Sequence, residues 1–358
     1  MPGGVPARMR AVLLRGHGGL EQLEYRDDVP VPRPAAGEVL LRVRAAGVNN
    51  TDINLRSGWY SKSEAETPGV GRPPAQTTDG GWTGEALTFP RIQGADACGE
   101  IVAVGAGISR ARIGERVLVD PVLRPGAGGS GRARYFGSDC DGAFAEYAAV
   151  PARNARRIGS ALSDVELASF PCSYSAAENM LARAGVASGE TVLVTGASGG
   201  VGSAAVQLAR RRGARVVAIA GPAKAVAVGA LGAARVLSRD ADLGDDPGRE
   251  SVDVVIDVVG GRQFPQLLEV LRPGGRYAVA GAIAGPVVEL DLRTLYLKDL
   301  RLLGCTIPEA AVFGNLIGYV ERGEIRPLVA ATYPLGEVAA AQREFLAKGH
   351  VGKIVLVP

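Results

Sequence analysis

The sequence predicts an α/β protein of two domains: a β-rich domain and a domain built on a doubly wound parallel sheet. A chain of 358 residues is long enough for two cores. Within residues 1–150, short alternating apolar runs such as 39–44 and 99–104 are interrupted by glycine and proline, which is typical of strands. From about residue 160, apolar strands alternate with helical stretches, which indicates a parallel sheet with crossover helices.

The hydrophobic pattern divides the second half of the chain into elements. Short apolar runs that end at glycine, proline or polar residues are predicted as strands, and longer amphipathic stretches as helices. The predicted strands are 191–195, 215–220, 252–258 and 276–280, and the predicted helices are 201–212, 223–231 and 263–271. The last part of the chain is expected to form a helix followed by short strands.

The composition argues against several classes of function. A net charge of +3 with scattered arginines gives no basic patch for nucleic acid. The sequence contains no apolar run of membrane-spanning length, and its start has no apolar leader. The four cysteines are far apart and form no C-x-x-C pair, so a disulfide framework is the weaker alternative. We therefore expect a soluble cytoplasmic protein that binds neither nucleic acid nor membrane.

Residues 61–89 form an unusual segment, polar and rich in glycine, proline and threonine. Loops of this length inside compact domains are uncommon unless they cover a site, bind a partner or are disordered. The sequence leaves these alternatives open.

The stretch TGASGGVG, residues 195–202, joins a predicted strand to a predicted helix. Such a turn presents backbone N–H groups at the positive end of a helix dipole, and both favour a pyrophosphate. Because the turn is part of a complete strand–helix–strand unit, it predicts a dinucleotide site. The residues that we assign to this site are Ala197, Ser198, Gly199, Gly200, Val201 and Gly202 and, further along, Gly221, Val259 and Gly281.

The residues after the second predicted strand favour NADPH over NADH. An NAD site usually has an acidic residue about 20 residues past the glycines, which binds the ribose 2′-hydroxyl. Here no acidic residue occurs between Glu190 and Asp240. Lys224 and Arg239 are the candidates to bind a 2′-phosphate, and the alternative for each is a solvated surface cation.

The glycine loop alone also resembles that of short-chain dehydrogenases. Those enzymes carry the loop near the N-terminus and a later Tyr-x-x-x-Lys, whereas none of the nine tyrosines here has lysine four residues on. This chain places the loop behind a β-rich domain. Both features argue against the short-chain class.

Motifs along nearly the whole chain resemble the medium-chain dehydrogenase/reductase superfamily, in particular its zinc-free quinone oxidoreductase-like branch. They are PAAGEVLLRVRAAGVNNTDINLRSGWY, GADACGEIVAVGAG, IGERVLV, GAFAEYAAVPA, the glycine loop, VDVVIDVVGG, PGGRYAVAG and GHVGKIVLVP, in that order. The resemblance implies a GroES-like β-barrel catalytic domain (1–158 and 308–358) and a Rossmann NADPH-binding domain (159–307), with the active site in a cleft between them. It also implies a homodimer formed by edge-to-edge pairing of a strand at 300–307.

The resemblance also argues against a catalytic metal. Zinc-dependent relatives have cysteine where Asn49 stands and a His-Glu pair where Ala95-Asp96 stands, with a third ligand near Cys172. Of these positions only Cys172 keeps a good thiolate donor, and a catalytic zinc needs three protein ligands. The cluster of four cysteines that holds a structural zinc in those relatives is reduced to Cys140. We expect no metal.

Without a Lewis acid, reduction of a conjugated C=C is easier to catalyse than oxidation of an alcohol, because one or two hydrogen-bond donors suffice for a delocalised enolate. By resemblance, Asn49 lies beside the nicotinamide, Tyr60 reaches the substrate, and Tyr174 is a weaker catalytic candidate. For both tyrosines a packed ring with its hydroxyl bonded to backbone is the alternative. Asp52 is expected to brace the Asn49 loop.

These features predict an NADPH-dependent, zinc-independent reductase of quinones or of α,β-unsaturated carbonyl compounds. Two alternatives remain open. One is a metal-free alcohol or ketone oxidoreductase. The other is an NADPH-binding biosynthetic or regulatory protein with a non-redox role.

Overall fold

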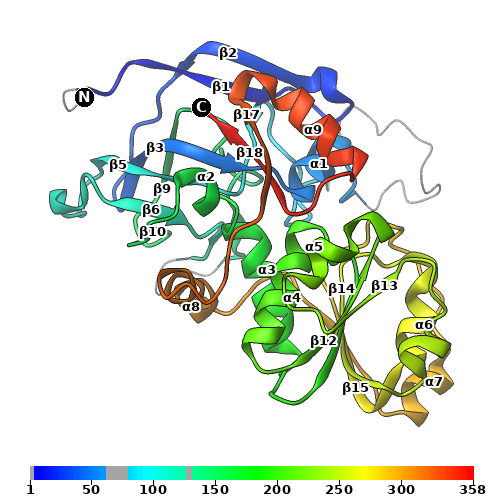
Figure 1. Cartoon of the computed structure of the whole chain (residues 1–358). Helices are drawn as coiled ribbons and strands as arrows, with labels where there is room; N and C mark the ends of the chain where they lie inside the picture. The colour runs from blue at the N-terminus through cyan, green and yellow to red at the C-terminus, as the bar shows by residue number, and fades with distance from the viewer. Residues whose placement is uncertain (1–3, 62–79, 126–130) are drawn as a thin grey trace. The chain divides into compact units, whose positions relative to one another are not determined.

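The computed structural model of the chain describes residues 4–61, 80–125 and 131–358 (Figure 1). The chain forms two compact units. Unit 1 contains Met1–Cys172 and Pro327–Pro358, and unit 2 contains Ser173–Arg326. Both ends of the chain therefore belong to unit 1, and unit 2 is a single continuous stretch.

The two unit boundaries lie later in the chain than the expected residues 158 and 307. Helix α2 (Asp164–Leu167) stays with unit 1, where Asp164 accepts a 2.7 Å hydrogen bond from Arg116. Helix α8 (Ala310–Glu321) stays with unit 2, where the Arg211 guanidinium carbon lies 3.5 Å from the centre of the Tyr319 ring. Contacts between residues far apart in sequence set these boundaries, and the hydrophobic pattern does not reveal them.

Unit 1 consists mainly of short strands, as expected for the first 150 residues. In its described part, seven strands form a sheet of order β10-β6-β5-β3-β18-β17 with β9 also paired to β3, three form a sheet of order β2-β1-β4, and β7 pairs with β8. The strands are β1 (Arg8–Leu14), β2 (Leu23–Pro30), β3 (Glu38–Gly47), β4 (Arg91–Ile92), β5 (Cys98–Val104), β6 (Arg116–Val119), β7 (Val122–Leu123), β8 (Arg134–Tyr135), β9 (Tyr147–Pro151), β10 (Ala155–Arg157), β17 (Val329–Pro334) and β18 (Lys353–Val357).

Strand β3 is the centre of unit 1. It is buried along most of its length because β5, β9 and β18 all pair with it. Strand β5 instead alternates buried and partly exposed residues, the period of a strand with one face in the core. The helices of this unit are α1 (Asn50–Ser57), α2 and α9 (Val338–Ala347). Helix α3 (Pro171–Arg183) contains the first unit boundary.

Unit 2 is a six-stranded parallel sheet of order β13-β12-β11-β14-β15-β16, which confirms the doubly wound fold. The order reverses between β11 and β14, and helices α4 and α6 lie on opposite sides of the sheet (Figure 1). Its strands are β11 (Thr191–Val194), β12 (Arg215–Ala220), β13 (Arg235–Ser238), β14 (Val252–Asp257), β15 (Leu271–Val279) and β16 (Arg301–Gly304), and its further helices are α4 (Gly200–Arg211), α5 (Ala225–Gly229), α6 (Phe264–Glu269) and α7 (Leu292–Leu297).

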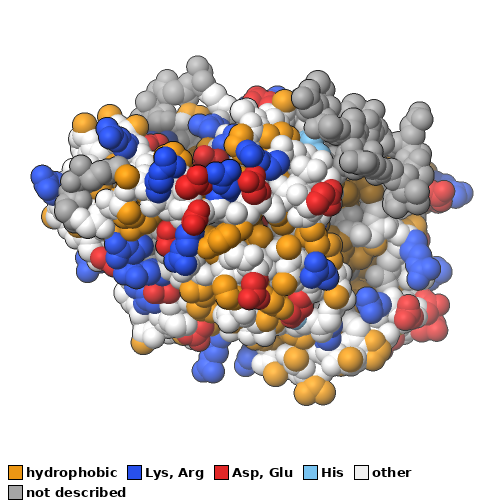
Figure 2. All heavy atoms as spheres, turned by 90° about the horizontal axis from the view of Figure 1, so that it is seen from above, with side chains coloured by type: hydrophobic (Ala, Val, Ile, Leu, Met, Phe, Trp, Pro, Cys, Tyr) orange, Lys and Arg blue, Asp and Glu red, His pale blue; other side chains and the backbone are white. Residues whose placement is uncertain are grey.

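The surface carries no dominant charge on the face shown in Figure 2, where basic and acidic side chains are interspersed with apolar ones. Among the described residues, no helix is both long and apolar enough to cross a membrane. Of the unusual segment 61–89, residues 62–79 lie outside the described residues.

Candidate functional site

The glycine loop joins β11 to α4 at the carboxyl edge of the sheet in unit 2. Helix α4 begins at Gly200, so the N–H groups of its first turn have no partner within the helix. A Cβ atom on Gly202 would lie 2.2 Å from the carbonyl oxygen of Gly196, so only glycine fits where the helix packs on the turn. This is the geometry of an anion site that suits a pyrophosphate.

A buried carboxylate holds the loop after β14 beside the glycine loop. Asp257 is fully buried and accepts hydrogen bonds from Thr195 Oγ1 at 2.5 Å, from the Tyr277 hydroxyl and from the Val259 N–H at 2.8 Å. One carboxylate thereby ties together β11, β14 and β15. It fixes the main chain of Val259 next to the end of β11.

Two cations lie near one another beyond β12. A Cβ atom on Gly221 would meet Arg239 Nη2 at 3.4 Å, so this guanidinium lies against the chain at the end of β12. The pKa of Lys224 is lowered by its partial burial and by the positive charge of Arg239. A bound anion in this region would offset the repulsion between the two positive charges.

The structure brings the predicted cofactor residues to a single edge of the sheet. They follow the carboxyl ends of five strands, β11 to β15. These residues are Ala197, Ser198, Gly199, Gly200, Val201, Gly202, Gly221, Lys224, Arg239, Val259 and Gly281.

In unit 1, Asn49 lies between the end of β3 and the start of α1, where its side chain is almost fully buried. Its amide oxygen accepts a 2.5 Å hydrogen bond from Lys353 Nζ. Its amide nitrogen donates to Asp96 Oδ2 at 2.9 Å and to the Gly47 carbonyl at 3.3 Å. Both amide hydrogens are therefore used within unit 1, and neither remains for a substrate oxygen.

Asp96 connects three distant parts of unit 1. Its carboxylate accepts hydrogen bonds from Asn49, from Lys353 Nζ at 2.8 Å and from the Cys172 N–H at 2.6 Å. The Asp96 side chain is fully buried and that of Lys353 is 4% exposed. The antiparallel pairing of β18 with β3 brings Lys353 to this position.

Asp52 braces the Asn49 loop, as expected. Its buried carboxylate accepts the Asn49 N–H at 2.8 Å and the Gly94 N–H at 3.3 Å. Burial raises the pKa of Asp52 to about 7, although the backbone N–H of Asn49 and the charge of Lys353 oppose the rise. Asp52 therefore titrates near neutral pH.

Tyr60 follows α1 and belongs to the same region of unit 1. Burial raises the pKa of its phenol, and the nearby Asp52 carboxylate acts in the same direction. Hydrogen bonds with the side chains of Asn54 and Thr51 partly oppose this rise. The phenol is protonated at neutral pH and can donate to an oxyanion.

Two aromatic rings stack beside Cys172. The Tyr135 hydroxyl donates to Cys172 Sγ at 3.1 Å, and the Trp82 ring stacks on Tyr135 with ring centres 4.4 Å apart. Burial raises the pKa of the Cys172 thiol to about 12, so it is neutral. A neutral thiol is a poor nucleophile.

Comparison with known proteins identifies the family of this fold. Residues 35–160 match the family described as alcohol dehydrogenase GroES-like domain, and residues 200–322 match the family described as zinc-binding dehydrogenase. An acryloyl-coenzyme A reductase from Metallosphaera sedula is 31% identical over 97% of this chain and 99% of its own length. The chain belongs to the medium-chain dehydrogenase/reductase superfamily.

Two further relatives are similar to this chain over nearly their whole length. A quinone oxidoreductase from Lama guanicoe is 30% identical over 98% of this chain and 97% of its own. A protein from Sinorhizobium meliloti 1021, provisionally assigned as an alcohol dehydrogenase, has a known crystal structure and is 52% identical in sequence to this chain. The two structures superpose with a TM-score of 0.91 over 99% of this chain and 98% of that chain. The expected combination of a GroES-like domain and a Rossmann domain is confirmed.

The zinc that one family description names does not fit the side chains of this superfamily member. A catalytic zinc needs three protein ligands around an open position. Here Asn49 Oδ1 and Asp96 Oδ2 both face the Lys353 ammonium, which uses the lone pairs that a metal would need. Within the described residues, no group of three or more His, Cys, Asp or Glu side chains could hold a metal.

Tyr174 lies in unit 2, whereas Asn49 and Tyr60 lie in unit 1. The Tyr174 side chain is buried, its hydroxyl donates to the Arg326 carbonyl at 2.6 Å, and it accepts from Gln207 Nε2 at 2.9 Å. The hydroxyl proton is thus used by backbone, which makes Tyr174 the weakest of the three candidates.

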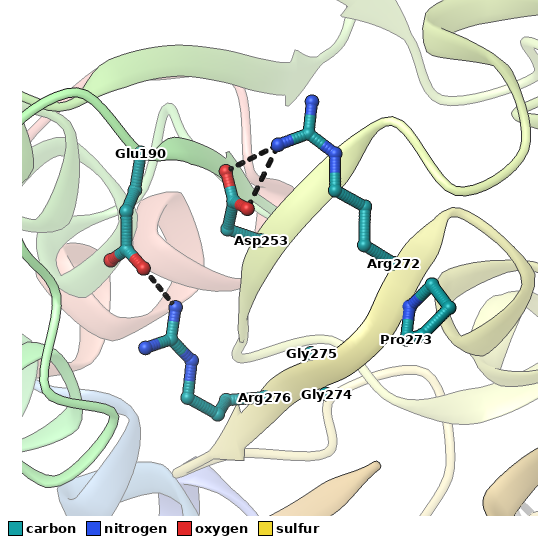
Figure 3. Close-up of a pocket in the computed structure, with 7 residues that line it drawn as sticks. All are labelled: Glu190, Asp253, Arg272, Pro273, Gly274, Gly275 and Arg276. Carbon is teal, nitrogen blue, oxygen red and sulfur yellow. Dashed lines mark hydrogen bonds and ion pairs between the residues drawn. The ribbon is translucent and has the colours of Figure 1, made fainter. Parts of the chain in front are cut away.

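A hollow at the amino edge of the unit 2 sheet is lined by ion pairs (Figure 3). Arg276 binds Glu190 at 2.5 Å, and Arg272 binds Asp253 at 2.9 Å. Two positive and two negative charges cancel in pairs, so the hollow has no net charge with which to attract an ion. We interpret it as a structural ion-pair cluster.

We call Asn49, Asp96, Cys172 and Lys353 the unit 1 cluster. Sequence reasoning missed Lys353 in this cluster, and it also missed Tyr135, whose hydroxyl contacts Cys172. The signal for Lys353 was a single cation that opens an otherwise apolar strand, KIVLV, because a buried lysine requires a partner. Tyr135 carried no comparable signal, since it lies in a two-residue strand beside glycine-rich sequence.

Proposed function

We propose that this chain is an NADPH-dependent, zinc-independent reductase that transfers hydride to a quinone or to the C=C of an α,β-unsaturated carbonyl compound. The observation that carries the proposal is the position of Lys353 Nζ, 2.5 Å from Asn49 and 2.8 Å from Asp96. Because the Lys353 ammonium contacts the oxygens that a metal ion would need, the unit 1 cluster has no Lewis acid. The relatives named for reducing acryloyl-coenzyme A and quinones support the same reaction class.

The choice of NADPH rests on unit 2. Lys224 and Arg239 place two positive charges beyond β12, where a carboxylate would instead select NADH. The glycine loop would hold the pyrophosphate on the first turn of α4, and Val259 and Gly281 would contact the nicotinamide half. When bound, NADPH supplies the hydride.

The proposed role of Tyr60 follows from the charge that develops during reduction. Hydride addition to a conjugated C=C places negative charge on the carbonyl oxygen, and a protonated phenol can donate a hydrogen bond to it. Asn49 acts differently from the expected donor, because both of its amide hydrogens are used by Asp96 and Gly47. We propose that Asn49 positions the start of α1, and Tyr60 lies shortly after the end of that helix.

We also propose a homodimer in the cytoplasm. Strand β16 is an edge strand of the unit 2 sheet, and unpaired edges favour pairing with another chain. Large apolar side chains near this edge are exposed, among them Leu292, Tyr296, Leu297 and Leu302. All four cysteines are free thiols, which supports a reducing compartment.

The test is NADPH oxidation measured with an enone, a quinone, a ketone and an alcohol, with and without a chelator. We expect turnover of the enone or the quinone and no effect of the chelator. Turnover of the ketone or alcohol alone would favour the alternative oxidoreductase. Product formation without NADPH oxidation, or NADPH binding without turnover, would favour a non-redox role.

A further inference from the structure

We infer that Asp257 supplies a fixed negative charge that favours the oxidised, positively charged form of the nicotinamide cofactor over its reduced form, and that this charge assists hydride transfer. The inference concerns one carboxylate at the carboxyl end of β14. It rests on one part of the proposed function, the binding of a nicotinamide dinucleotide, and it holds for NADPH and NADH alike.

Asp257 is fully buried, and the groups that contact its oxygens are neutral. Two hydroxyls donate to it, that of Thr195 at 2.5 Å and that of Tyr277. Two backbone N–H groups also donate, that of Val259 at 2.8 Å and that of Gly260 at 3.1 Å. Within residues 4–61, 80–125 and 131–358, no lysine or arginine forms an ion pair with it. A buried charge is ordinarily paired with an opposite charge, so this one lacks the usual compensation.

The hydrogen bonds favour the ionised form of Asp257. The Thr195 hydroxyl oxygen accepts the Val258 N–H at 3.1 Å, so its own proton is donated to Asp257. Burial and the negative charge of Asp257 raise the pKa of Tyr277, so the Tyr277 hydroxyl keeps the proton that it donates. Hydroxyl and N–H protons therefore converge on both oxygens, and the ionised carboxylate is the form that accepts them all.

The other end of the same strand shows the usual arrangement. Asp253 lies near the amino end of β14, where it accepts the Thr191 N–H at 2.7 Å and forms an ion pair with Arg272 at 2.9 Å (Figure 3). The guanidinium cancels the charge of Asp253. Strand β14 thus has a neutralised acid at its amino end and an acid without a cation at its carboxyl end, where a doubly wound sheet binds its ligand.

The place of Asp257 in the sheet assigns it to the nicotinamide half of the cofactor. Lys224 follows β12 and Arg239 follows β13, on one side of the glycine loop that ends β11. Strand β14 lies on the other side of β11, where the strand order reverses. A dinucleotide with its pyrophosphate at the glycine loop and its 2′-phosphate at Lys224 therefore extends its nicotinamide half toward β14.

Hydride transfer changes the charge of that half by one unit. A hydride, which is a proton with two electrons, leaves C4 of the dihydronicotinamide ring for the β-carbon of the acceptor, so one C–H bond breaks and another forms. The ring gains one positive charge and the acceptor oxygen gains one negative charge. A fixed negative charge in a site of low dielectric stabilises the positive ring, both in the bound oxidised cofactor and in the transition state that leads to it.

Isothermal titration calorimetry of the purified full chain tests this with NADP⁺ and NADPH, and again with NAD⁺ and NADH. Four proteins are compared: wild type, Asp257→Asn, Asp253→Asn as the same substitution at the other end of β14, and Tyr277→Phe, which removes a donor but keeps the charge. We expect wild type to bind NADP⁺ more tightly than NADPH. In Asp257→Asn the ratio of the two affinities should shift toward NADPH by about three- to tenfold, and in the two controls by less than about twofold.

A purely structural role of Asp257 would weaken both forms of the cofactor alike. An unchanged ratio in folded Asp257→Asn therefore overturns the inference alone, and an equal shift in Asp253→Asn does so too. Absence of binding by both cofactor pairs would overturn the proposed function together with the inference. Asp257→Ser is a second neutral variant. If neither neutral variant folds, wild type decides, because tighter binding of NADP⁺ supports the inference and tighter binding of NADPH contradicts it.

Discussion

The hydroxyl of Tyr174 donates a 2.6 Å hydrogen bond to the carbonyl oxygen of Arg326. Tyr174 is the second residue of unit 2 and Arg326 is the last. Gln207 strengthens the connection, because its amide accepts from the Arg326 N–H at 2.9 Å and also binds the Tyr174 hydroxyl. The two points where the chain passes between the units are thus joined inside unit 2.

Tyr174→Phe removes this bond while keeping the ring. We expect unit 2 to lose about 0.5–1.5 kcal/mol of stability, the usual contribution of one hydrogen bond. Hydrogen exchange should rise in peptides that contain Gln207 and Arg326, and kcat should change little. A 100-fold loss of kcat with unchanged exchange would instead return Tyr174 to the catalytic residues.

Lys224→Ala should weaken NADPH and leave NADH nearly unaffected. A charged contact with the 2′-phosphate contributes about 1.5–3 kcal/mol, and wild type should prefer NADPH at least about tenfold. Isothermal titration calorimetry of both cofactors measures the difference. Lys348→Ala, at the end of α9 in unit 1, is the matched control that removes one lysine elsewhere. Equal binding of NADPH and NADH by wild type would contradict the assignment.

Tyr60→Phe should lower kcat for an enone about 100- to 1000-fold, because it removes a donor from the developing oxyanion, a loss of about 2.7–4 kcal/mol. Quinone reduction should suffer less, since a quinone can take its proton from water at oxygen. Asn49→Ala should lower kcat too, and it should also reduce stability because it leaves Lys353 and Asp96 with fewer partners. NADPH affinity should stay nearly unchanged in both variants. Wild-type turnover by Tyr60→Phe would remove Tyr60 from the mechanism.

Asp52 should make the stability of unit 1 fall as the pH rises from about 5 to about 7. Its pKa is about 7 in the folded protein and ordinarily 3.8, so in this window the folded state keeps a proton that the unfolded state has lost. Its contribution therefore declines with pH at up to about 1.4 kcal/mol per pH unit and levels off above pH 7.

Urea unfolding at pH 5 and pH 8 measures this effect. Both tryptophans, Trp59 and Trp82, lie in unit 1, so their fluorescence reports on it. Asp52→Asn mimics the protonated carboxyl and should show a smaller difference between the two pH values than wild type. The same difference in both proteins would show that Asp52 does not titrate in this range.

Leu302→Arg should convert the proposed homodimer to a monomer. Leu302 lies in the edge strand β16, is 38% exposed, and a charge there would be buried by pairing. Light scattering at micromolar concentration distinguishes the two states. Val226→Arg is the control. Val226 is 88% exposed and lies in α5, which connects β12 to β13, the edge strand on the opposite side of the sheet from β16. Wild type that is already monomeric would contradict the proposal.

The sequence predicts unit 2 well because its information is local. Buried parallel strands appear in the sequence as short apolar runs, and the glycine loop predicts both the turn and the start of α4. The strands predicted from the hydrophobic pattern correspond to β11, β12, β14 and β15, and the strand expected at 300–307 corresponds to β16, whereas β13 was not predicted. Arg235–Ser238 is only partly buried, so β13 has a weak apolar pattern.

The unit 1 cluster could not be predicted because it depends on pairing between distant strands. Asn49 and Lys353 are 304 positions apart, and only the register of β18 on β3 brings them together. The interpretation of Asn49 as a donor followed from the resemblance to the family. The structure changes that role, because the neighbouring Asp96 and Lys353 determine which way the amide faces.

The discontinuity of unit 1 has a consequence for the order of events at the ribosome. Unit 2 can fold as soon as it emerges, but the strand that completes the β3 sheet is made only after the 154 residues of unit 2. At about 5–20 residues per second that delay is roughly 8–30 seconds. Throughout it, Asp96 lacks its cation and β3 lacks one of its three neighbouring strands, so one edge of the nascent N-terminal sheet stays unpaired.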